Sequence, residues 1–214
     1  MFQQMLNSSI AVLRRPSVAT FEEHEKNDLG AATVYVIIGS IISAIFGAIG
    51  FTIQRPYIEQ QLRELNRQFG AGSPFQNLMG GQSIGGAIAS NLIGTLIGFF
   101  IYLGLVYFIG RAFGGTGNFG ELAYDTSLFT VPLAVLSAFI RIFSIGPLAL
   151  LTGLISLALA IYNVYLTYLT IQSGMNLPSN KALYVILILI AIPILLACLF
   201  AILIGGLIAS TNPS

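Results

Sequence analysis

Charge is scarce in this sequence. Only 8% of its 214 residues are Asp, Glu, Lys or Arg, whereas an ordinary soluble domain carries roughly a quarter. Hydrophobic residues make up 56% of the chain, so too little polar surface remains to keep it in water. The formal net charge of +1 gives no electrostatic basis for binding nucleic acid. The composition therefore predicts an integral membrane protein without a nucleic-acid partner.

Residues that commonly carry chemistry are also few. The single histidine, His24, precedes the first long apolar run, which excludes paired-histidine haem ligation and a histidine metal cluster inside the membrane. The single cysteine, Cys198, excludes an internal disulfide, and its apolar surroundings favour a small buried hydrophobe. No nucleophile has a visible base beside it. We therefore expect no enzymatic activity, no cofactor and no metal.

Five apolar runs are long enough to cross a hydrocarbon layer of about 30 Å at a rise of about 1.5 Å per residue. They cover residues 33–53, 84–109, 122–140, 147–171 and 182–208. The expected fold is all-α: a polytopic domain of five transmembrane helices over residues 31–209, preceded by an N-terminal interfacial segment, residues 1–30. Five crossings place the two ends of this domain on opposite sides of the membrane.

Two amphipathic helices are expected outside the five spans. In the N-terminal segment, apolar residues recur at helical spacing and the basic residues follow them, which is the reverse of a signal peptide. We expect an uncleaved helix on the membrane surface. The second helix covers residues 56–69, where Pro56 suits a first helical turn and the apolar residues share one face. It could lie on the bilayer, cap the bundle or dock a partner.

Lys and Arg near the ends of the spans indicate the orientation. They divide five to four between the N-terminal side and the other side: Arg14, Arg15, Lys26, Arg111 and Lys181 against Arg55, Arg63, Arg67 and Arg141. The balance favours an N-terminus in the cytoplasm and a C-terminus outside, in a multi-pass protein of the cell membrane.

Small residues form stripes at four-residue spacing in two spans. Gly39, Ser43 and Gly47 repeat in the first span, and Gly94 and Gly98 do so in the second. Such stripes allow helix backbones to approach closely, within one bundle or between proteins. The expected partners are membrane lipids and either other membrane proteins or a second copy of this chain.

One acidic residue, Asp125, lies inside a span, and an intramembrane carboxylate indicates a functional site such as a proton or cation site. Because this span is expected to start at Leu122, Asp125 falls in its first turn, where the helix dipole favours an anion structurally. A transport path would join Asp125 to Asn91 and Asn163 in neighbouring spans. Hydrogen bonding between helices is the alternative role for these polar groups.

A glycine-rich loop separates the second and third spans. The stretch from Gly115 to Gly120 matches G-x-G-x-x-G, but a transmembrane helix precedes it where a dinucleotide site needs a strand, so the match is interpreted as chance. Gly114, Gly115 and Gly117 are followed by Tyr124 and Pro132 in the next helix. With Arg15-Pro16 and Thr20-Phe21-Glu22 before the first span, this chain resembles a prokaryotic member of the Yip1 family.

The resemblance implies a five-helix membrane domain with a cytoplasmic N-terminus and a C-terminus across the membrane. Eukaryotic relatives are implicated in vesicle traffic through Rab-type GTPases and carry an Asp-Leu-Tyr-Gly-Pro element before the first span. This chain has only Asp28-Leu29-Gly30 there. The resemblance therefore implies the fold and the topology, and it implies no activity for the chain.

The small-residue stripes and the amphipathic helices together predict a non-enzymatic membrane scaffold or accessory subunit that packs against other membrane proteins. Two alternatives stay open. One is a small transporter or channel with a polar path around Asp125, and the other is a membrane-shaping or trafficking protein that acts through its two amphipathic segments.

Overall fold

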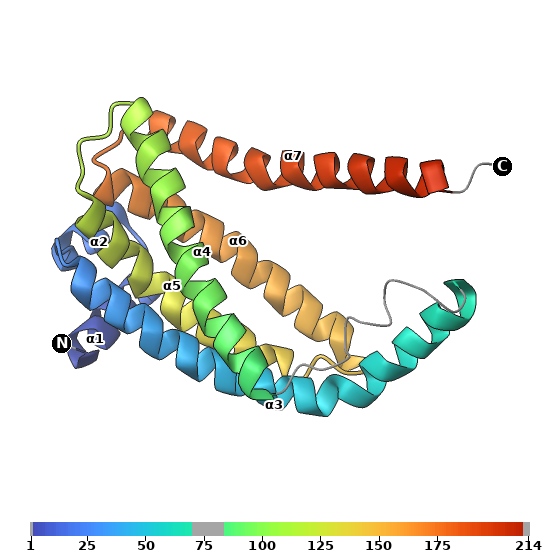
Figure 1. Cartoon of the computed structure of the whole chain (residues 1–214). Helices are drawn as coiled ribbons and strands as arrows, with labels where there is room; N and C mark the ends of the chain where they lie inside the picture. The colour runs from blue at the N-terminus through green and yellow to red at the C-terminus, as the bar shows by residue number, and fades with distance from the viewer. Residues whose placement is uncertain (1, 70–83, 212–214) are drawn as a thin grey trace.

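The computed structural model describes the backbone of residues 2–69 and 84–211 (Figure 1). It also describes the side chains of these residues, except those of residues 65, 66, 68, 69, 84, 85, 87, 91 and 204–211. Within these residues the chain forms seven helices: α1 Phe2–Arg14, α2 Val18–His24, α3 Leu29–Phe69, α4 Ile84–Ala112, α5 Phe119–Arg141, α6 Leu148–Gly174 and α7 Ser179–Thr211. Of the described helices, α3 to α7 are the five that are long and apolar enough to cross a membrane. The predicted all-α polytopic bundle with five transmembrane helices is confirmed.

Short polar side chains set the starts of α3 and α5. Asp28 Oδ1 accepts a hydrogen bond of 2.8 Å from the backbone N–H of Ala31, which has no partner within the helix. At α5, the backbone N–H of Asn118 donates to Glu121 Oε2 at 3.1 Å. These contacts start α5 at Phe119, three residues before the start that the apolar run predicted.

Helix α5 is the centre of the bundle and packs against α1, α3, α4 and α6 (Figure 1). It is the most buried of the five spanning helices. It packs tightly against α3 at Gly39, where an added Cβ would overlap the side chain of Val131. The glycine therefore allows α3 and α5 to form the most extensive helix pair of the fold.

Helix α3 continues through Pro56, which differs from the expected separate helix over residues 56–69. Proline removes one backbone donor, and the helix bends and continues, as Figure 1 shows. The residues that follow are good helix formers with charge pairs one turn apart. Arg55 Nε lies 2.8 Å from Glu59 Oε1, and Arg67 Nη1 lies 3.0 Å from Glu64 Oε1. The amphipathic segment is thus an extension of the first span.

Helix α1 packs through one face and exposes another. Met5 and Val12 are buried against the bundle, whereas Phe2, Leu6 and Ile10 are 44%, 40% and 43% exposed. Apolar residues therefore lie on both the inner and the outer face of α1. This arrangement suits a helix at the boundary between water and lipid, where the outer face contacts the membrane.

Helix α7 joins the bundle only through its first turns. Ala182, Val185 and Ile186 are buried, but every side chain from Pro193 to Leu203 is exposed. Figure 1 shows α7 extending away from the other helices. Cys198 is consequently exposed, and the expectation that it is a buried hydrophobe is wrong. A local apolar run could not show that its helix leaves the bundle.

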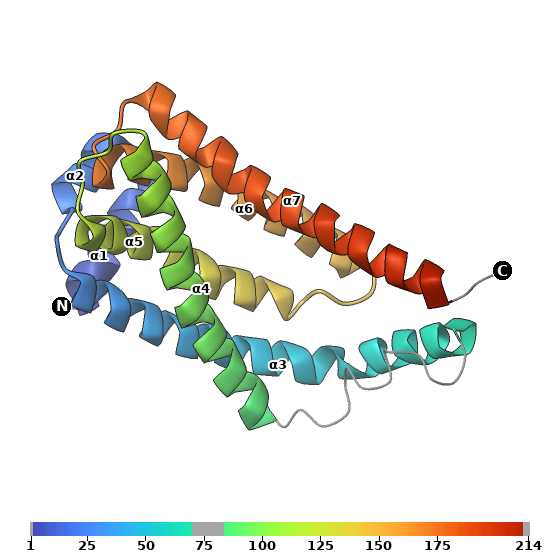
Figure 2. The same ribbon diagram turned by 45° about the horizontal axis from the view of Figure 1, so that its top comes forward.

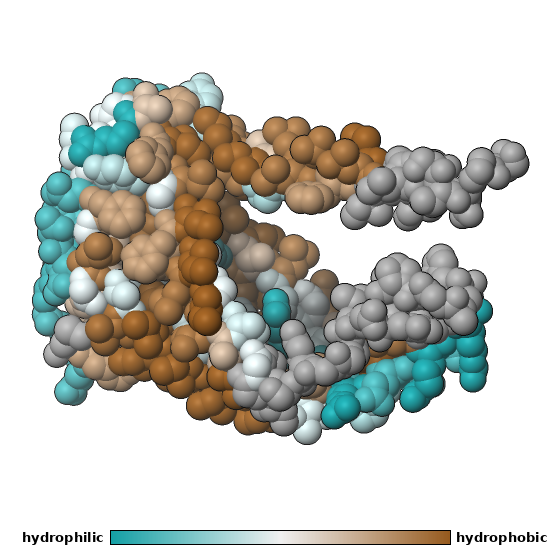
Figure 3. All heavy atoms as spheres, in the orientation of Figure 1, coloured by the Kyte–Doolittle hydropathy of each residue, from teal (hydrophilic) through white to brown (hydrophobic). Residues whose placement is uncertain are grey.

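The surface is divided by polarity. In Figure 3 an apolar band lies between a polar end formed by α1, α2 and the adjoining loops and a second polar region on the extension of α3. The two ends of the described chain lie at opposite ends of the molecule (Figures 1 and 2). The molecule is a multi-pass membrane protein whose apolar band matches the five spanning helices.

Candidate functional site around Asp125 and the glycine loop

Asp125 is the most deeply buried acidic residue of the described chain, with an exposed fraction of 0%. It lies on α5 and faces α6, where the Ser173 hydroxyl donates a hydrogen bond of 2.9 Å to Asp125 Oδ2. Asp125 Oδ1 has no hydrogen-bond partner among the described residues. A buried carboxyl with an unused oxygen is costly to retain, which makes this position a candidate site.

The expected place of Asp125 in the first turn of its helix is wrong. Because α5 begins at Phe119, Asp125 is its seventh residue and lies beyond the free N–H groups of the helix start. Its carboxylate therefore does not cap the helix. The interaction that holds it comes from Ser173 on another helix, and the helix dipole is not the main reason for its presence.

Other acidic residues surround this position. The charged neighbours of Asp125 are Glu25, Glu121 and Glu22, and none of the four forms an ion pair within the described part of the chain. Glu25 lies outside the membrane spans and is half-buried, and its Oε1 has no hydrogen-bond partner among the residues described. Burial raises the pKa of Glu25, and the charges of Glu121 and Glu22 raise it further. Such a group can take up a proton or attract a cation.

Sequence reasoning missed a row of buried hydroxyl residues on α6, one of which, Ser173, contacts Asp125. Thr167, Thr170 and Ser173 are all buried and recur at three-residue spacing, which places them along one face of the helix. The Tyr102 hydroxyl donates to Thr167 Oγ1 at 3.1 Å, whereas Thr170 Oγ1 has no partner in the described chain. The regular spacing of hydroxyl residues in an otherwise apolar span was the signal that could have revealed this face.

The glycine loop docks onto the turn between α6 and α7. The backbone N–H of Thr116 donates to the Met175 carbonyl at 3.0 Å. Gly114 has a φ of +89°, a conformation that glycine adopts without strain. An added Cβ at Gly117 would overlap the Gly174 carbonyl, and one at Gly115 would lie 2.9 Å from the Met175 side chain. The glycines serve a close backbone contact, and this packing accounts for the loop without a dinucleotide.

The remaining residues of the family-like pattern lie apart from one another. Tyr124 is buried next to Asp125, with an exposed fraction of 1%. Pro132 lies two turns further along α5 and lines an apolar groove between α3 and α5. Arg111, at the start of the loop, donates from Nη1 to the Gly115 carbonyl at 3.3 Å and so holds the loop closed.

Asn163 lies in a different place from Asp125. It lines a cavity of about 320 Å³ together with hydroxyl residues, among them Ser40, Ser43 and Tyr102. Asn163 is ten residues before Ser173 on α6, which corresponds to about 15 Å along the helix. Asn91 belongs to α4, but its side chain lies outside the described residues. The structure therefore does not bring Asp125 and Asn163 into one site.

The small-residue stripes have different surroundings. Gly39 contacts Val131 of α5, and the Ser43 hydroxyl is buried without a hydrogen-bond partner in the described chain. Gly47, Gly94 and Gly98 are exposed, and an added Cβ at any of the three would meet no atom within 4 Å. The first stripe therefore packs against α5 only at Gly39. The second stripe, Gly94 and Gly98, faces away from the other described helices.

Comparison with known proteins gives one match. A family model described as the Yip1 domain matches residues 10–207 of the chain. The matched range begins within α1 and ends within α7, so it includes the glycine loop and the residues around Asp125. No curated protein and no solved structure matches the chain.

Proposed function

Since this chain belongs to the Yip1 domain family of membrane proteins, we propose that it is a non-enzymatic scaffold or accessory subunit that packs against other membrane proteins. Membership confirms the resemblance that the glycine loop predicted. The family accounts for a membrane-embedded domain. The more specific role rests on surfaces that none of the described helices covers.

The observation that carries the proposal is the course of α7. From Pro193 to Leu203 its side chains are exposed on all sides, and almost all of them are apolar. A helix that only completes the bundle would bury one face along its whole length. A membrane helix that has no neighbour among the described residues offers its full circumference to lipid or to helices of another protein.

The exposed pair Gly94 and Gly98 on α4 supports the same role. In membranes, helices associate through close packing at small residues, because lipid chains remove the hydrophobic driving force. A small-residue stripe that meets no other described residue is a surface suited to a helix of another protein or of a second copy. We place lipids around the rest of the apolar band.

Cys198 allows the proposal to be tested in the unmodified protein. It is the only cysteine and lies exposed on the outlying part of α7. A reagent that joins a maleimide to a benzophenone, attached at Cys198 in native membranes and irradiated so that the benzophenone inserts into a C–H bond of its neighbour, is expected to yield a defined adduct heavier than the monomer. Gentle solubilisation followed by native mass analysis is expected to yield a complex of the same composition. Cys198→Ser removes the adduct and serves as the control. A protein that runs only as a monomer and forms no adduct contradicts the scaffold.

A second candidate function is a small transporter or channel. The cavity beside Asn163 shares Ser43 and Ala134 with another cavity that reaches Gln54 and Arg141. Together they make a route along α3 and α5 toward the end of the molecule opposite α1, lined mainly by apolar residues with some hydroxyl and amide side chains among them. Flux in proteoliposomes is expected to fall in Asn163→Leu and to change little in Asp125→Asn if this route conducts. Equal flux in wild type and Asn163→Leu rules it out.

We also propose that the end carrying α1 and α2 faces the cytoplasm and that the C-terminal end of α7 lies across the cell membrane. The balance of basic residues and the family's arrangement both support this orientation.

A further inference from the structure

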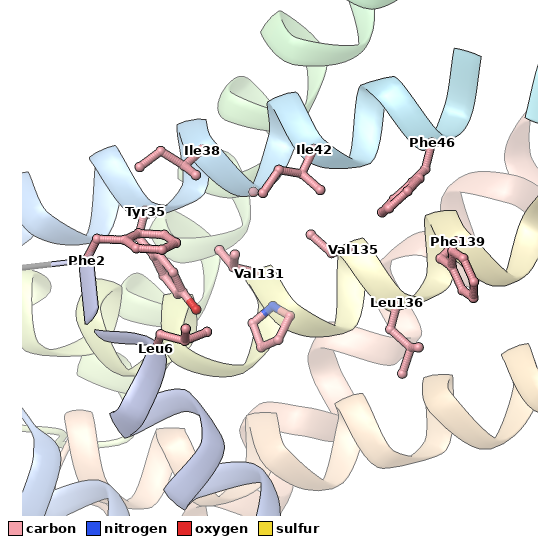
Figure 4. Close-up of a pocket in the computed structure, with 12 residues that line it drawn as sticks. Phe2, Leu6, Tyr35, Ile38, Ile42, Phe46, Val131, Val135, Leu136 and Phe139 are labelled. Atoms are coloured by element: carbon pink, nitrogen blue, oxygen red, sulfur yellow. The ribbon is translucent and has the colours of Figure 1, made fainter. Parts of the chain in front are cut away.

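An apolar groove of about 340 Å³ runs between α3 and α5 on the side where α1 lies (Figure 4). Ile38 and Ile42 of α3 line one wall, and Val135 and Leu136 of α5 line the other. Ile42 and Leu136 are 36% and 43% exposed, so nothing in the described chain fills the space between the two walls. The groove is a cleft in the surface that the bilayer contacts.

Aromatic residues close the groove at both ends. At the α1 end, the rings of Phe2 and Tyr35 meet edge to face with centroids 5.9 Å apart, and the Tyr35 hydroxyl and Ser9 Oγ are 3.0 Å apart in a hydrogen bond. At the other end, the rings of Phe46 and Phe139 pack edge to face at 5.6 Å. The groove is therefore open along its side and bounded in length.

Its length corresponds to one leaflet of a bilayer. Tyr35 and Phe46 are eleven residues apart on α3, which is about 16 Å at a rise of about 1.5 Å per residue. Half of a hydrocarbon layer of about 30 Å is about 15 Å. Both walls belong to spanning helices, and α1 lies at the polar end of the molecule. The groove therefore reaches from the membrane surface to about its middle.

The length of the groove decides which occupant fits. Its apolar walls end after about 16 Å at the aromatic pair Phe46 and Phe139, whereas a helix that crosses the whole layer needs a surface about 30 Å long. An extended hydrocarbon chain, with a contact diameter of about 4 Å between carbons, needs roughly 200 Å³ over about 16 Å. The groove, at about 340 Å³, has room for one such chain.

We propose that this groove binds one acyl chain of a phospholipid from the leaflet on the α1 side, with the headgroup at the level of α1. Moving an acyl chain from bulk lipid into the groove changes no exposure to water, so its binding comes from contact and shape. Rigid walls and closed ends supply that shape. The site is independent of the proposed scaffold role, because α7 and the Gly94–Gly98 stripe lie outside it.

The test uses the full-length protein in phosphatidylcholine vesicles that contain a phosphatidylcholine with a photoactivatable diazirine on one acyl chain. After irradiation, mass mapping of peptides is expected to find severalfold more label on residues 35–46 and 131–139 than on the more exposed lipid-facing residues of α6 and α7. Ile42→Trp and Leu136→Trp fill the groove from opposite walls, and each is expected to lower the groove labelling severalfold.

Ile45→Trp is the matched control, because Ile45 is 50% exposed on the same helix but lies outside the groove. It is expected to label like wild type. Since the chain has no tryptophan of its own, the emission of each new indole also reports that the variant is folded with that side chain in apolar surroundings. Label spread over all helices in proportion to exposure, equal loss in Ile45→Trp, or a groove peptide cross-linked to another chain overturns the proposal.

Discussion

A single hydrogen bond joins two fully buried polar residues of the fold, Asp125 and Ser173. The contribution of this hydrogen bond to stability can be judged by comparing Ser173 with Thr170, which is also on α6. The hydroxyl of Thr170 is buried too, but it has no partner in the described chain. Removing a hydrogen-bonded hydroxyl leaves its partner unsatisfied, whereas removing an unpartnered one relieves a cost. The two positions therefore provide a matched pair.

We predict that Ser173→Ala lowers the free energy of unfolding by about 1–2 kcal/mol, because Asp125 loses its hydrogen bond in a membrane interior. The isosteric change Thr170→Val is expected to leave stability unchanged or to raise it slightly. Unfolding in mild detergent, followed by circular dichroism, measures both. Equal losses in the two variants would show that the Asp125–Ser173 hydrogen bond contributes nothing of its own.

The half-buried carboxyl of Glu25 is expected to make the stability of the fold depend on pH. Burial raises its pKa above the ordinary value of 4.5, and Glu121 and Glu22 add to the effect. The folded chain therefore holds this proton more tightly than the unfolded chain, and its stability falls as the pH rises from 4.5 through the raised pKa of Glu25. Glu25→Gln is expected to raise Tm at pH 7 relative to wild type and to flatten the change between mildly acidic and neutral pH.

Glu23→Gln is the control for this pH effect, because Glu23 lies next to the cluster in the sequence but is exposed. Its Tm is expected to follow wild type at each pH. If Glu25→Gln and Glu23→Gln behave alike, the half-buried carboxyl has no influence on the stability of the fold.

Among the described glycines, Gly117 has the least room for a side chain, because the glycine loop lies directly on the turn between α6 and α7. We predict that Gly117→Ala costs about 1–3 kcal/mol, because its methyl group must displace the Gly174 backbone and the hydrogen bond from Thr116 to Met175. Gly153→Ala on α6 is the control, since an added Cβ there meets nothing within 4 Å. The control is expected to stay within about 0.5 kcal/mol of wild type in the same unfolding assay.

The exposed stripe on α4 tests association without disturbing the fold. Gly98→Leu places a bulky side chain where the chain itself has no neighbour, so the monomer is expected to keep its Tm. The complex seen in native mass analysis is expected to dissociate, because two helices can no longer approach closely there. Gly153→Leu is the matched control on α6, also exposed. If the Gly98→Leu variant keeps its complex, this stripe is not part of the interface.

The helices themselves could be predicted because a run of apolar residues of sufficient length has few alternatives in a membrane. Their ends were harder to place. Pro56 is compatible with both the start and the interior of a helix, and the contact between Asn118 and Glu121 outweighed the apolar run at the start of α5. Hydropathy averages over such local contacts, which is why the predicted boundaries differ from the observed ones.

The candidate site could be predicted less well than the helices. Asp125 was identifiable as an unusual residue, but its partner Ser173 is 48 positions away and becomes visible only when α5 and α6 pack. Asn163, grouped with it from composition, proved to line a separate cavity. Glu25 lies before the first span and reaches the site through the packing of α2 on the bundle. Each of these facts depends on tertiary contacts between distant segments.

For the molecule as a whole, the orientation across the membrane is testable with two engineered cysteines in a Cys198→Ser background. Glu23→Cys marks the end with α1 and α2, and Gln61→Cys marks the extension of α3; both positions are exposed. A membrane-impermeant maleimide added to intact cells is expected to label Gln61→Cys at once and Glu23→Cys only after permeabilisation. The reverse pattern would invert the proposed orientation.

The central position of α5 also has a consequence for biosynthesis. Of the five spanning helices it has the lowest mean hydropathy and the highest burial, whereas α7 is the most apolar and among the least buried. A segment with Asp125, Thr126 and Ser127 in succession partitions poorly into lipid by itself, because each polar group needs a partner there. Helix α5 should therefore leave the translocon together with α3 and α4 and complete its polar contacts when α6 arrives. A nascent chain arrested before α6 is expected to be recognised as unassembled and degraded.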